Sequence, residues 1–167
     1  MSGAARETGG FLQGLIQPRL VFTNLAPASL EDALAEMASR AEEAGVVSDA
    51  ADLTRRLLER ERLGCTGLGA GIAIPHCKLK DVDGIVLAVG ACPAGVDFHA
   101  PDGIAVTLIF LILSPAQAPA LHLQALARIS RLLKVPGVAD SLRRAQTPEA
   151  LVAALREAEG AVTVARG

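Results

Sequence analysis

The feature that most constrains the fold is an apolar run, IAVTLIFLIL, at residues 104–113. The run is far shorter than the ~20 residues that a membrane-spanning helix needs. It is also apolar at consecutive positions, which is typical of a strand buried on both faces of a sheet. Strands and helices are interleaved along the rest of the chain. The sequence therefore predicts an α/β fold, a single domain with a mixed β-sheet covered by helices.

The other elements are predicted from hydrophobic periodicity and from capping residues. Ser29 is expected to cap one helix, a second helix is expected to begin near Ser48–Asp49, and Thr147 with Pro148 is expected to begin the last one. The predicted strands are 19–25, 72–74, 85–92 and 104–113, and the predicted helices are 29–45, 48–64, 120–134, 138–145 and 147–159. We expect a flexible N-terminal segment at 1–17, the domain at 18–160 and a C-terminal tail at 161–167.

Composition excludes several classes of function. The chain has 167 residues and a net charge of −2, with both signs spread along it, so neither a nucleic-acid partner nor membrane insertion is expected. The N-terminus lacks the pattern of a signal peptide. The three cysteines are an odd number without zinc-ligand spacing. A reduced, cytoplasmic protein without a metal is therefore expected.

Arg60 is the first residue that breaks the local pattern. Leu53, Leu57 and residue 60 lie at i, i+4 and i+7, so position 60 should extend the buried seam of its helix. One interpretation is that the apolar stem packs while the guanidinium reaches solvent. The other is that the guanidinium faces an anion near the glycine-rich turn that follows.

His122 is the second such residue. It shares a helical stripe with Leu126, Ile129 and Leu133, so it should face inward at the first turn of its helix. A histidine in this place is either a hydrogen-bonded boundary residue or a functional group. The helix N-terminus should keep it neutral, because that end disfavours added positive charge.

His76 is the third. It follows Pro75 and the apolar segment 72–74, and we expect its imidazole to lie where this strand leaves the sheet, a common location for functional groups. Glycines precede it at 64, 67, 69 and 71; they either let another surface approach or form a plain flexible turn. Their spacing does not match a phosphate-binding GxGxxG loop. Cys77 should point away from His76, since neighbours on an extended segment alternate.

The segment RERLGCTGLGAGIAIPHCKL at 60–79 resembles the active-site segment of the enzyme IIA (EIIA) components of the bacterial phosphotransferase system, fructose/mannitol class (type 2). The matching motifs are Arg60-Glu61, Thr66-Gly67 and Ile72 to His76. The resemblance extends from about residue 19 to 159. It also includes FHAPDG at 98–103, LIFLILSP at 108–115 and HLQALARISRLL at 122–133.

The resemblance implies a phosphoryl relay that needs no cofactor or metal. His76 would accept the phosphoryl group from the phosphorylated carrier HPr, as a tele-phosphohistidine, and His122 and Arg60 would stabilise the phosphate. The next partner would be an EIIB component or a regulatory target protein. The segment TGLGAGIAIPH is most similar in sequence to the nitrogen-regulatory branch, which we therefore favour. The alternative is a sugar-specific EIIA that passes phosphate to EIIB during fructose- or mannitol-type uptake.

Three positions depart from the family pattern. Cys77 stands where glycine is common, Cys65 where serine is common, and His99 where an acid is frequent. Cys77 is expected to crowd the docking surface or to make it sensitive to oxidation. An inert binding module is a third interpretation, and the presence of Arg60, His76 and His122 together weakens it.

Overall fold

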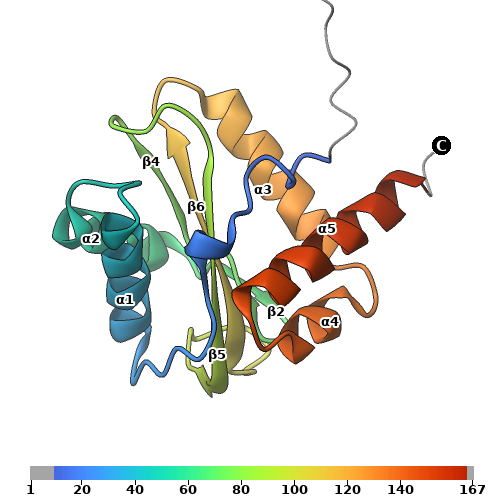
Figure 1. The fold of residues 1–167 in the computed structure, drawn as a ribbon. Helices are drawn as coiled ribbons and strands as arrows, with labels where there is room; N and C mark the ends of the chain where they lie inside the picture. Colours follow the sequence, from blue (N-terminus) through green and yellow to red (C-terminus); the bar gives the residue numbers. More distant parts are fainter. Residues whose placement is uncertain (1–9, 165–167) are drawn as a thin grey trace, which may run out of the picture.

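The structure of the protein, a computed structural model, describes residues 10–164. The parts of the predicted flexible segment and tail at 1–9 and 165–167 lie outside this range. Between them the chain forms one mixed sheet with helices on both faces, as the sequence predicts (Figure 1). None of the helices in this part of the chain is both long and apolar enough to cross a lipid bilayer.

The sheet is built around an antiparallel pair, β5 (Val86–Val96) and β6 (Val106–Pro115). β1 (Val21–Phe22) pairs in parallel with β5. β3 (Ile72–Ala73) and β4 (His76–Leu79) both pair in parallel with β6, and β2 (Gly67–Gly69) pairs with β3 in antiparallel fashion. The order is β1-β5-β6-β3-β2, with β4 beside β6.

Two layers of helices cover the sheet, as Figure 1 shows. On one face lie α1 (Leu30–Glu43) and α2 (Ala50–Leu63). On the other lie α3 (Pro119–Leu133), α4 (Val138–Arg144) and α5 (Pro148–Val164). The predicted cap at Ser29 is confirmed, since its Oγ accepts the N–H of Asp32 at 3.1 Å. The helix expected to begin near Ser48–Asp49 is capped by Asp49, whose Oδ1 accepts the N–H of Asp52 at 3.0 Å. Thr147 Oγ1 likewise accepts the N–H of Ala150 at 3.1 Å.

β6 is the central strand, and its burial on both faces is confirmed. Leu108, Phe110 and Ile112 belong to the cluster under α3 and α5, and Ile109, Leu111 and Leu113 to the cluster under α1 and α2. All six are fully buried. The prediction for 19–25 is wrong in length, because Pro18–Leu20 form a 3-10 turn and only Val21–Phe22 pair as a strand. Pro18 fixes its own φ and supplies no N–H, which suits the first turn of a helix better than a ladder.

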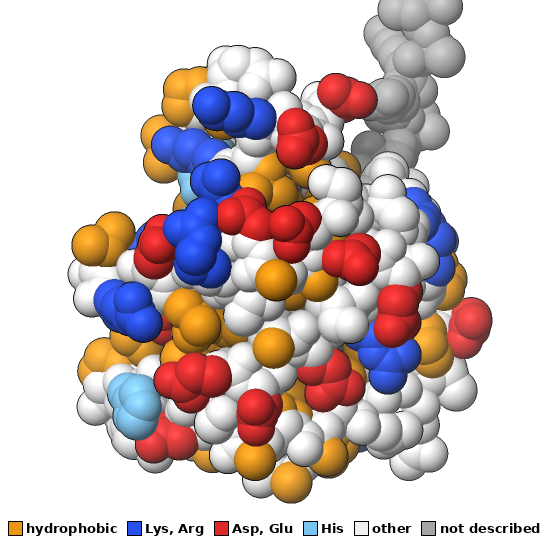
Figure 2. Space-filling view, turned by 90° about the vertical axis from the view of Figure 1, so that its left-hand side faces the viewer, with side chains coloured by type: hydrophobic (Ala, Val, Ile, Leu, Met, Phe, Trp, Pro, Cys, Tyr) orange, Lys and Arg blue, Asp and Glu red, His pale blue; other side chains and the backbone are white. Residues whose placement is uncertain are grey.

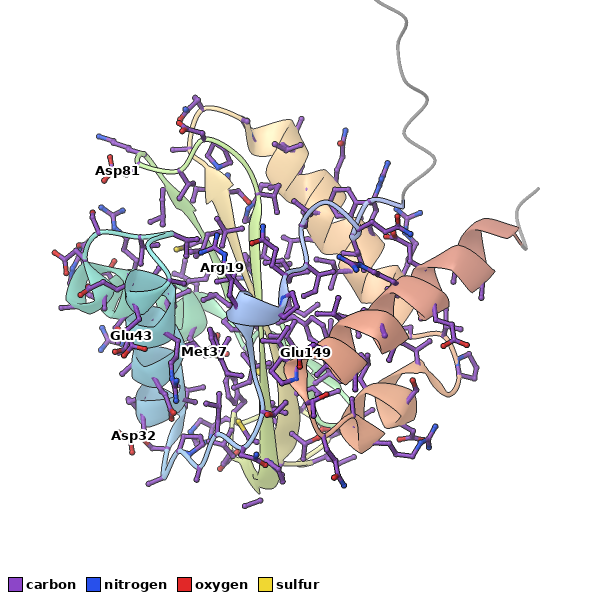
Figure 3. All side chains as sticks on the ribbon, viewed as in Figure 1. Arg19, Asp32, Met37, Glu43, Asp81 and Glu149 are labelled. Carbon is purple, nitrogen blue, oxygen red and sulfur yellow. The ribbon has the colours of Figure 1, made fainter. Side chains whose placement is uncertain are left out.

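Close packing of α1 against β5 requires a glycine on the strand. Met37 points from α1 toward the sheet, whereas Asp32 points outward from the same helix (Figure 3). A Cβ atom on Gly90 would lie 2.7 Å from Met37 Sδ and 2.7 Å from a methyl group of Leu25. Because real Cβ contacts are longer than this, only glycine lets helix and strand approach so closely.

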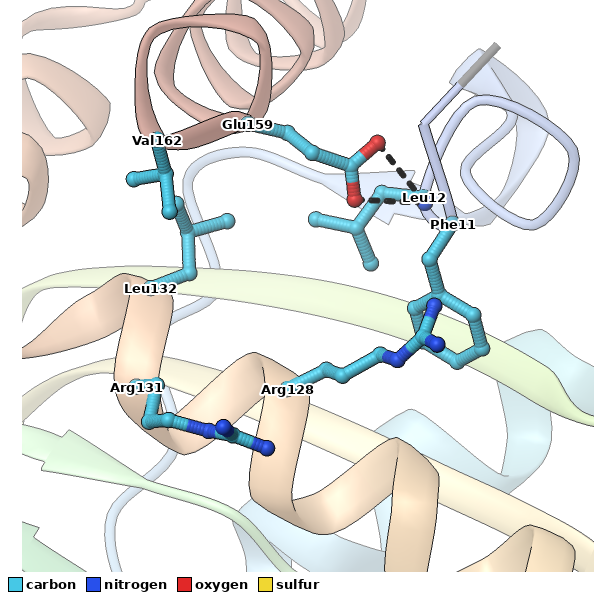
Figure 4. Close-up of a pocket in the computed structure, with 7 residues that line it drawn as sticks. All are labelled: Phe11, Leu12, Arg128, Arg131, Leu132, Glu159 and Val162. Atoms are coloured by element: carbon cyan, nitrogen blue, oxygen red, sulfur yellow. Dashed lines mark hydrogen bonds between the residues drawn. The ribbon is translucent and has the colours of Figure 1, made fainter. Parts of the chain in front are cut away.

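The segment before β1 packs between α3 and α5 (Figure 4). The Glu159 carboxylate accepts the backbone N–H of Leu12 at 3.0 and 2.8 Å, and the Arg128 guanidinium lies 4.7 Å from the centre of the Phe11 ring. Leu12 and Ile16 are buried in the core. This segment therefore closes the end of the sandwich opposite α1 and α2. The predicted domain limits, 18–160, remain a prediction.

Candidate functional site

His76 begins β4 after a break in the edge strand beside β6. Ile72 pairs with Leu108, and His76 pairs with Ile112. The offset between partners is the same on both sides of the break, so β3 and β4 follow one line interrupted at Pro75. The prediction that the strand leaves the sheet at His76 is therefore wrong. The strand resumes there, because the Pro75 carbonyl still accepts the N–H of Ile112 at 3.0 Å.

The backbone next to His76 fixes the tautomer of its imidazole. Nδ1 lies 2.7 Å from the carbonyl oxygen of Ile74. A carbonyl oxygen only accepts hydrogen bonds, so Nδ1 must carry the proton. In the neutral ring Nε2 then has a free lone pair. The imidazole is thus held as a nucleophile at Nε2.

His122 lies beside His76, on the first turns of α3. The two ring centres are 5.3 Å apart, with 53° between the ring planes. His122 is 6% exposed, and its Nδ1 lies 2.7 Å from Oγ of Ser114, which is fully buried on β6. A hydroxyl can donate to a neutral ring or accept from a protonated one. Ser114 can therefore hold His122 in both states while Nε2–H is available as a donor.

Arg60 lies in the wall of the pocket that contains His76. This pocket has a volume of about 430 Å³ and is also lined by Thr66, Gly67, Leu123 and Leu126. The Arg60 side chain is half-buried and donates from Nη1 to the carbonyl of Gly64 at 3.1 Å. Leu53 and Leu57 on the same seam are buried. The buried stripe of Leu53 and Leu57 therefore continues to Arg60, which lines the pocket.

Glu61 organises the turn that forms another wall. Its carboxylate accepts the N–H of Thr66 at 2.9 Å and the Thr66 hydroxyl at 2.7 Å. Thr66 in turn accepts the N–H of Ile74 on its carbonyl at 3.0 Å. Hydrogen bonds thus connect Glu61 through Thr66 to Ile74, whose carbonyl oxygen holds the imidazole of His76. The hairpin beyond it needs φ values of +86° at Gly69 and +79° at Gly71, a region that glycine adopts readily.

Burial and nearby cations keep both imidazoles neutral. Burial is the largest cause that lowers the pKa of His76, and Arg60 lowers it further; the Ile74 carbonyl and Glu61 act in the opposite direction. Burial is also the largest cause that lowers the pKa of His122, assisted by His76 when that ring is protonated and by the positive charges of Lys78 and Arg60. Each shift disfavours the protonated ring. At neutral pH the lone pair of His76 is therefore available.

The three departures from the family pattern lie in different environments. Cys77 packs with the cluster under α1 and α2, on the face opposite His76, and burial raises the pKa of its thiol to about 12. The expectation that Cys77 crowds the docking surface or sensitises it to oxidation is therefore wrong. Cys65 is exposed and lines the His76 pocket. His99 is exposed on the β5–β6 loop beside Asp97, at 3.3 Å.

Sequence reasoning missed Ser114 as part of this site. The available signal was the hydroxyl of Ser114, directly before Pro115, at the end of a buried strand whose only other polar side chain is Thr107. Only three polar or charged residues are buried in the described chain, namely Thr66, Ser114 and His122, and all three are at this site. Within residues 10–164, no group of three or more His, Cys, Asp or Glu side chains could hold a metal ion.

The fold, with His76 on β4 beside His122 on α3, defines a class of protein. Residues 14–158 match the family model described as "Phosphoenolpyruvate-dependent sugar phosphotransferase system, EIIA 2". The chain therefore belongs to the type 2 EIIA family of the phosphotransferase system, as the sequence motifs indicate.

Individual relatives include both a nitrogen regulatory protein and a sugar-specific component. The chain is 38% identical over 141 residues to the nitrogen regulatory protein of Bradyrhizobium diazoefficiens, which covers 84% of this chain and 92% of that protein. It is 32% identical over 138 residues to the fructose-specific EIIABC component of Bacillus subtilis, covering 83% of this chain and 22% of that protein. The crystal structure of nitrogen regulatory protein IIA-Ntr from Neisseria meningitidis superposes with a TM-score of 0.79 at 29% identity, covering 86% of this chain and 98% of that one.

Proposed function

We propose that this chain is a cytoplasmic phosphoryl relay that accepts a phosphoryl group from phosphorylated HPr on Nε2 of His76 and acts in nitrogen-branch regulation. One observation carries the proposal. The Ile74 carbonyl holds the proton of His76 on Nδ1 at 2.7 Å, and the ring of His122, buried beside it, lies 5.3 Å away. This arrangement leaves Nε2 of His76 as a nucleophile and Nε2–H of the neighbouring His122 as a donor.

Transfer in this site exchanges one phosphorus–nitrogen bond for another. The bond from phosphorus to the carrier's histidine breaks as the bond to Nε2 of His76 forms, and the carrier imidazole leaves with the electron pair. The transition state is loose, so positioning and charge stabilisation dominate. No cofactor or metal is needed, because the donor is itself a phosphohistidine.

Arg60 and His122 stabilise the phosphoryl group in this proposal. The guanidinium of Arg60 presents a planar fork of donors to phosphate oxygens. To reach them it gives up its hydrogen bond to the Gly64 carbonyl, at 3.1 Å. Only one partner of that bond is charged, whereas a bond from the guanidinium to a phosphate oxygen joins opposite charges and is stronger. His122 adds Nε2–H, oriented by Ser114.

The test is labelling by phosphoenolpyruvate, enzyme I and HPr. The wild type should gain one phosphoryl group that is labile in acid, and His76→Ala should gain none. His99→Ala is the matched control, because His99 is exposed on another loop, and it should label like the wild type. Full labelling of His76→Ala would refute the assignment.

The regulatory role is favoured over sugar transport by the relatives. The nitrogen regulatory protein of Bradyrhizobium diazoefficiens is matched over 92% of its length, at 38% identity. The alternative is a sugar-specific EIIA, supported by the likeness to the fructose-specific EIIABC component. Incubating the phosphorylated protein with a fructose-type EIIB separates the two, since rapid transfer to EIIB would support sugar transport.

A further inference from the structure

The hairpin between β2 and β3 contains an alanine in a strained backbone conformation. Ala70 has a φ of +55°, between Gly69 at +86° and Gly71 at +79°. Within residues 10–164 the other non-glycine residues with a positive φ are Asn24 and His99, and these two types adopt it more readily than alanine does. Strain of this kind persists only where the surrounding structure holds the residue in place. Contacts from outside the hairpin must therefore hold Ala70.

Two charged side chains from distant parts of the chain bind both backbone polar groups of Ala70. Asp102, on the loop between β5 and β6, accepts its N–H on Oδ2 at 2.8 Å. Arg143, on α4, donates from Nη2 to its carbonyl oxygen. A Cβ atom on Gly69 would lie 3.0 Å from Oδ2 of Asp102, and one on Gly71 would lie 3.0 Å from Nη2 of Arg143. Hydrogen bonds with a charged partner are stronger than neutral ones, so these two can offset the strain at Ala70.

The guanidinium of Arg143 uses all three of its nitrogen atoms. Besides the contact with the Ala70 carbonyl, Nε donates to the Thr107 hydroxyl at 2.9 Å, and Nη1 pairs with Asp140 at 3.1 Å. Thr107 in turn donates its backbone N–H to the Gly71 carbonyl at 2.8 Å. A guanidinium suits this position because its donors lie in a fixed fork. Arg143 thereby connects α4 and the start of β6 to the hairpin.

The same hairpin leads to the imidazole of His76. Figure 1 shows β2 beside α4, and Leu68 of β2 lines both the His76 pocket and a cavity of about 340 Å³ that Arg143 also lines. At the open end of the hairpin, the Thr66 carbonyl accepts the N–H of Ile74 at 3.0 Å. The Ile74 carbonyl then holds Nδ1 of His76 at 2.7 Å. A shift of the hairpin would therefore change the direction of the carbonyl that sets the tautomer of His76.

We propose that Arg143 and Asp102 are positioning residues, which hold Ala70 in its left-handed conformation and thereby orient the Ile74 carbonyl toward His76. This inference rests on the proposed function, because the step that it supports is transfer to Nε2 of His76. Neither side chain lines the His76 pocket in the described chain. Without them Ala70 relaxes toward negative φ and the Ile74 carbonyl loses its fixed direction. A larger share of the neutral rings then carries the proton on Nε2, where it blocks the nucleophile.

The rate of labelling by phosphorylated HPr tests this role. Arg143→Ala and Asp102→Ala should each slow labelling about tenfold, since a small misplacement caused far from the chemistry is enough to slow a reaction. Ala70→Gly should label like the wild type. Combined with either alanine variant it should restore most of the lost rate, because glycine adopts a positive φ without external contacts. Asp102→Ala carries the test if Arg143→Ala does not fold.

The ring nitrogen NMR signals of His76, measured before phosphorylation, report the tautomer directly. Arg143→Ala should move them toward the form protonated on Nε2, and adding Ala70→Gly should move them back. Arg144→Ala is the matched control, because Arg144 is the exposed neighbour of Arg143 on α4. Arg40→Ala is a second control, since Arg40 also pairs within its own helix, with Glu36. It lies on α1, and Figure 2 shows that the face over α1 and α2 carries both acidic and basic side chains. Both controls should match the wild type.

The outcomes separate this inference from the proposed function. An Arg143→Ala variant with a normal labelling rate and normal His76 signals would overturn the positioning role. Slow labelling that Ala70→Gly does not restore would also overturn it, because the effect would not pass through Ala70. If the wild type is not labelled at all, while Arg143→Ala shifts the His76 signals and Ala70→Gly reverses the shift, the positioning role is supported and the proposed function is refuted.

Discussion

Phosphorylation of His76 should make His122 bind a proton more tightly. The two rings are 5.3 Å apart, and His122 is buried. A unit negative charge at about this distance stabilises an imidazolium by about 1–3 kcal/mol for effective dielectric constants of about 80 to 20. Proton binding then becomes about 5- to 150-fold tighter. In the unphosphorylated protein, burial and neighbouring cations lower the pKa of His122. The negative charge of the phosphoryl group should act against both causes and raise this pKa.

The assay is an NMR titration of the three histidines before and after phosphorylation. The pKa of His122 should rise, while His99, whose side chain is 80% exposed on a separate loop, serves as the internal reference signal. Linkage makes the effect reciprocal. Formation of phospho-His76 should therefore become more favourable as the pH falls through the raised pKa of His122.

Ser114 supplies the companion variant. Ser114→Ala removes the hydroxyl that lies 2.7 Å from Nδ1 of His122, so the ring loses the contact that orients Nε2 toward the phosphate. The pKa rise should shrink, and transfer to His76 should slow. Identical titration of His122 in both phosphorylation states would show that the ring does not contact the phosphate, and the proposed role would be wrong.

Three further outcomes follow from the geometry. Arg60→Lys keeps the charge and loses the planar fork, so transfer should slow roughly tenfold with little change in melting temperature; a normal rate with a lower melting temperature would make the residue structural. Gly90→Ala should lower the free energy of unfolding by about 1–3 kcal/mol through overpacking, whereas Gly84→Ala, with open space around it, should change little in a denaturant titration. Because the folded state lowers the pKa of both His76 and His122 from 6.5, the unfolded chain binds more protons, and stability measured by denaturant should fall as the pH drops through 6.5.

The sequence predicted the helices and the central strand because their signals are local. The cap at Ser29 and the apolar run of β6 need no information from distant residues. The interruption at Pro75 was not predicted correctly, because continuation of the strand depends on β6, which lies 36 residues further along the chain. Ser114 was missed for a similar reason, since its role as a hydrogen-bond partner of His122 is apparent only once α3 lies beside β6.

Arg60 and His76 line one pocket, and the ring of His122 lies 5.3 Å from that of His76, so the candidate site combines burial with positive charge. Burial alone would keep His76 neutral, but a buried apolar site would exclude the dianionic phosphoryl group. Cations alone would attract the phosphate and would leave the imidazole hydrated. Together they lower the pKa of His76, which frees Nε2, and they provide the charge that the phosphoryl group needs after it arrives. Removing the charge of Arg60 should therefore raise the pKa of His76 and slow transfer at the same time, and NMR titration of Arg60→Gln beside its transfer rate would reveal whether the two effects occur together.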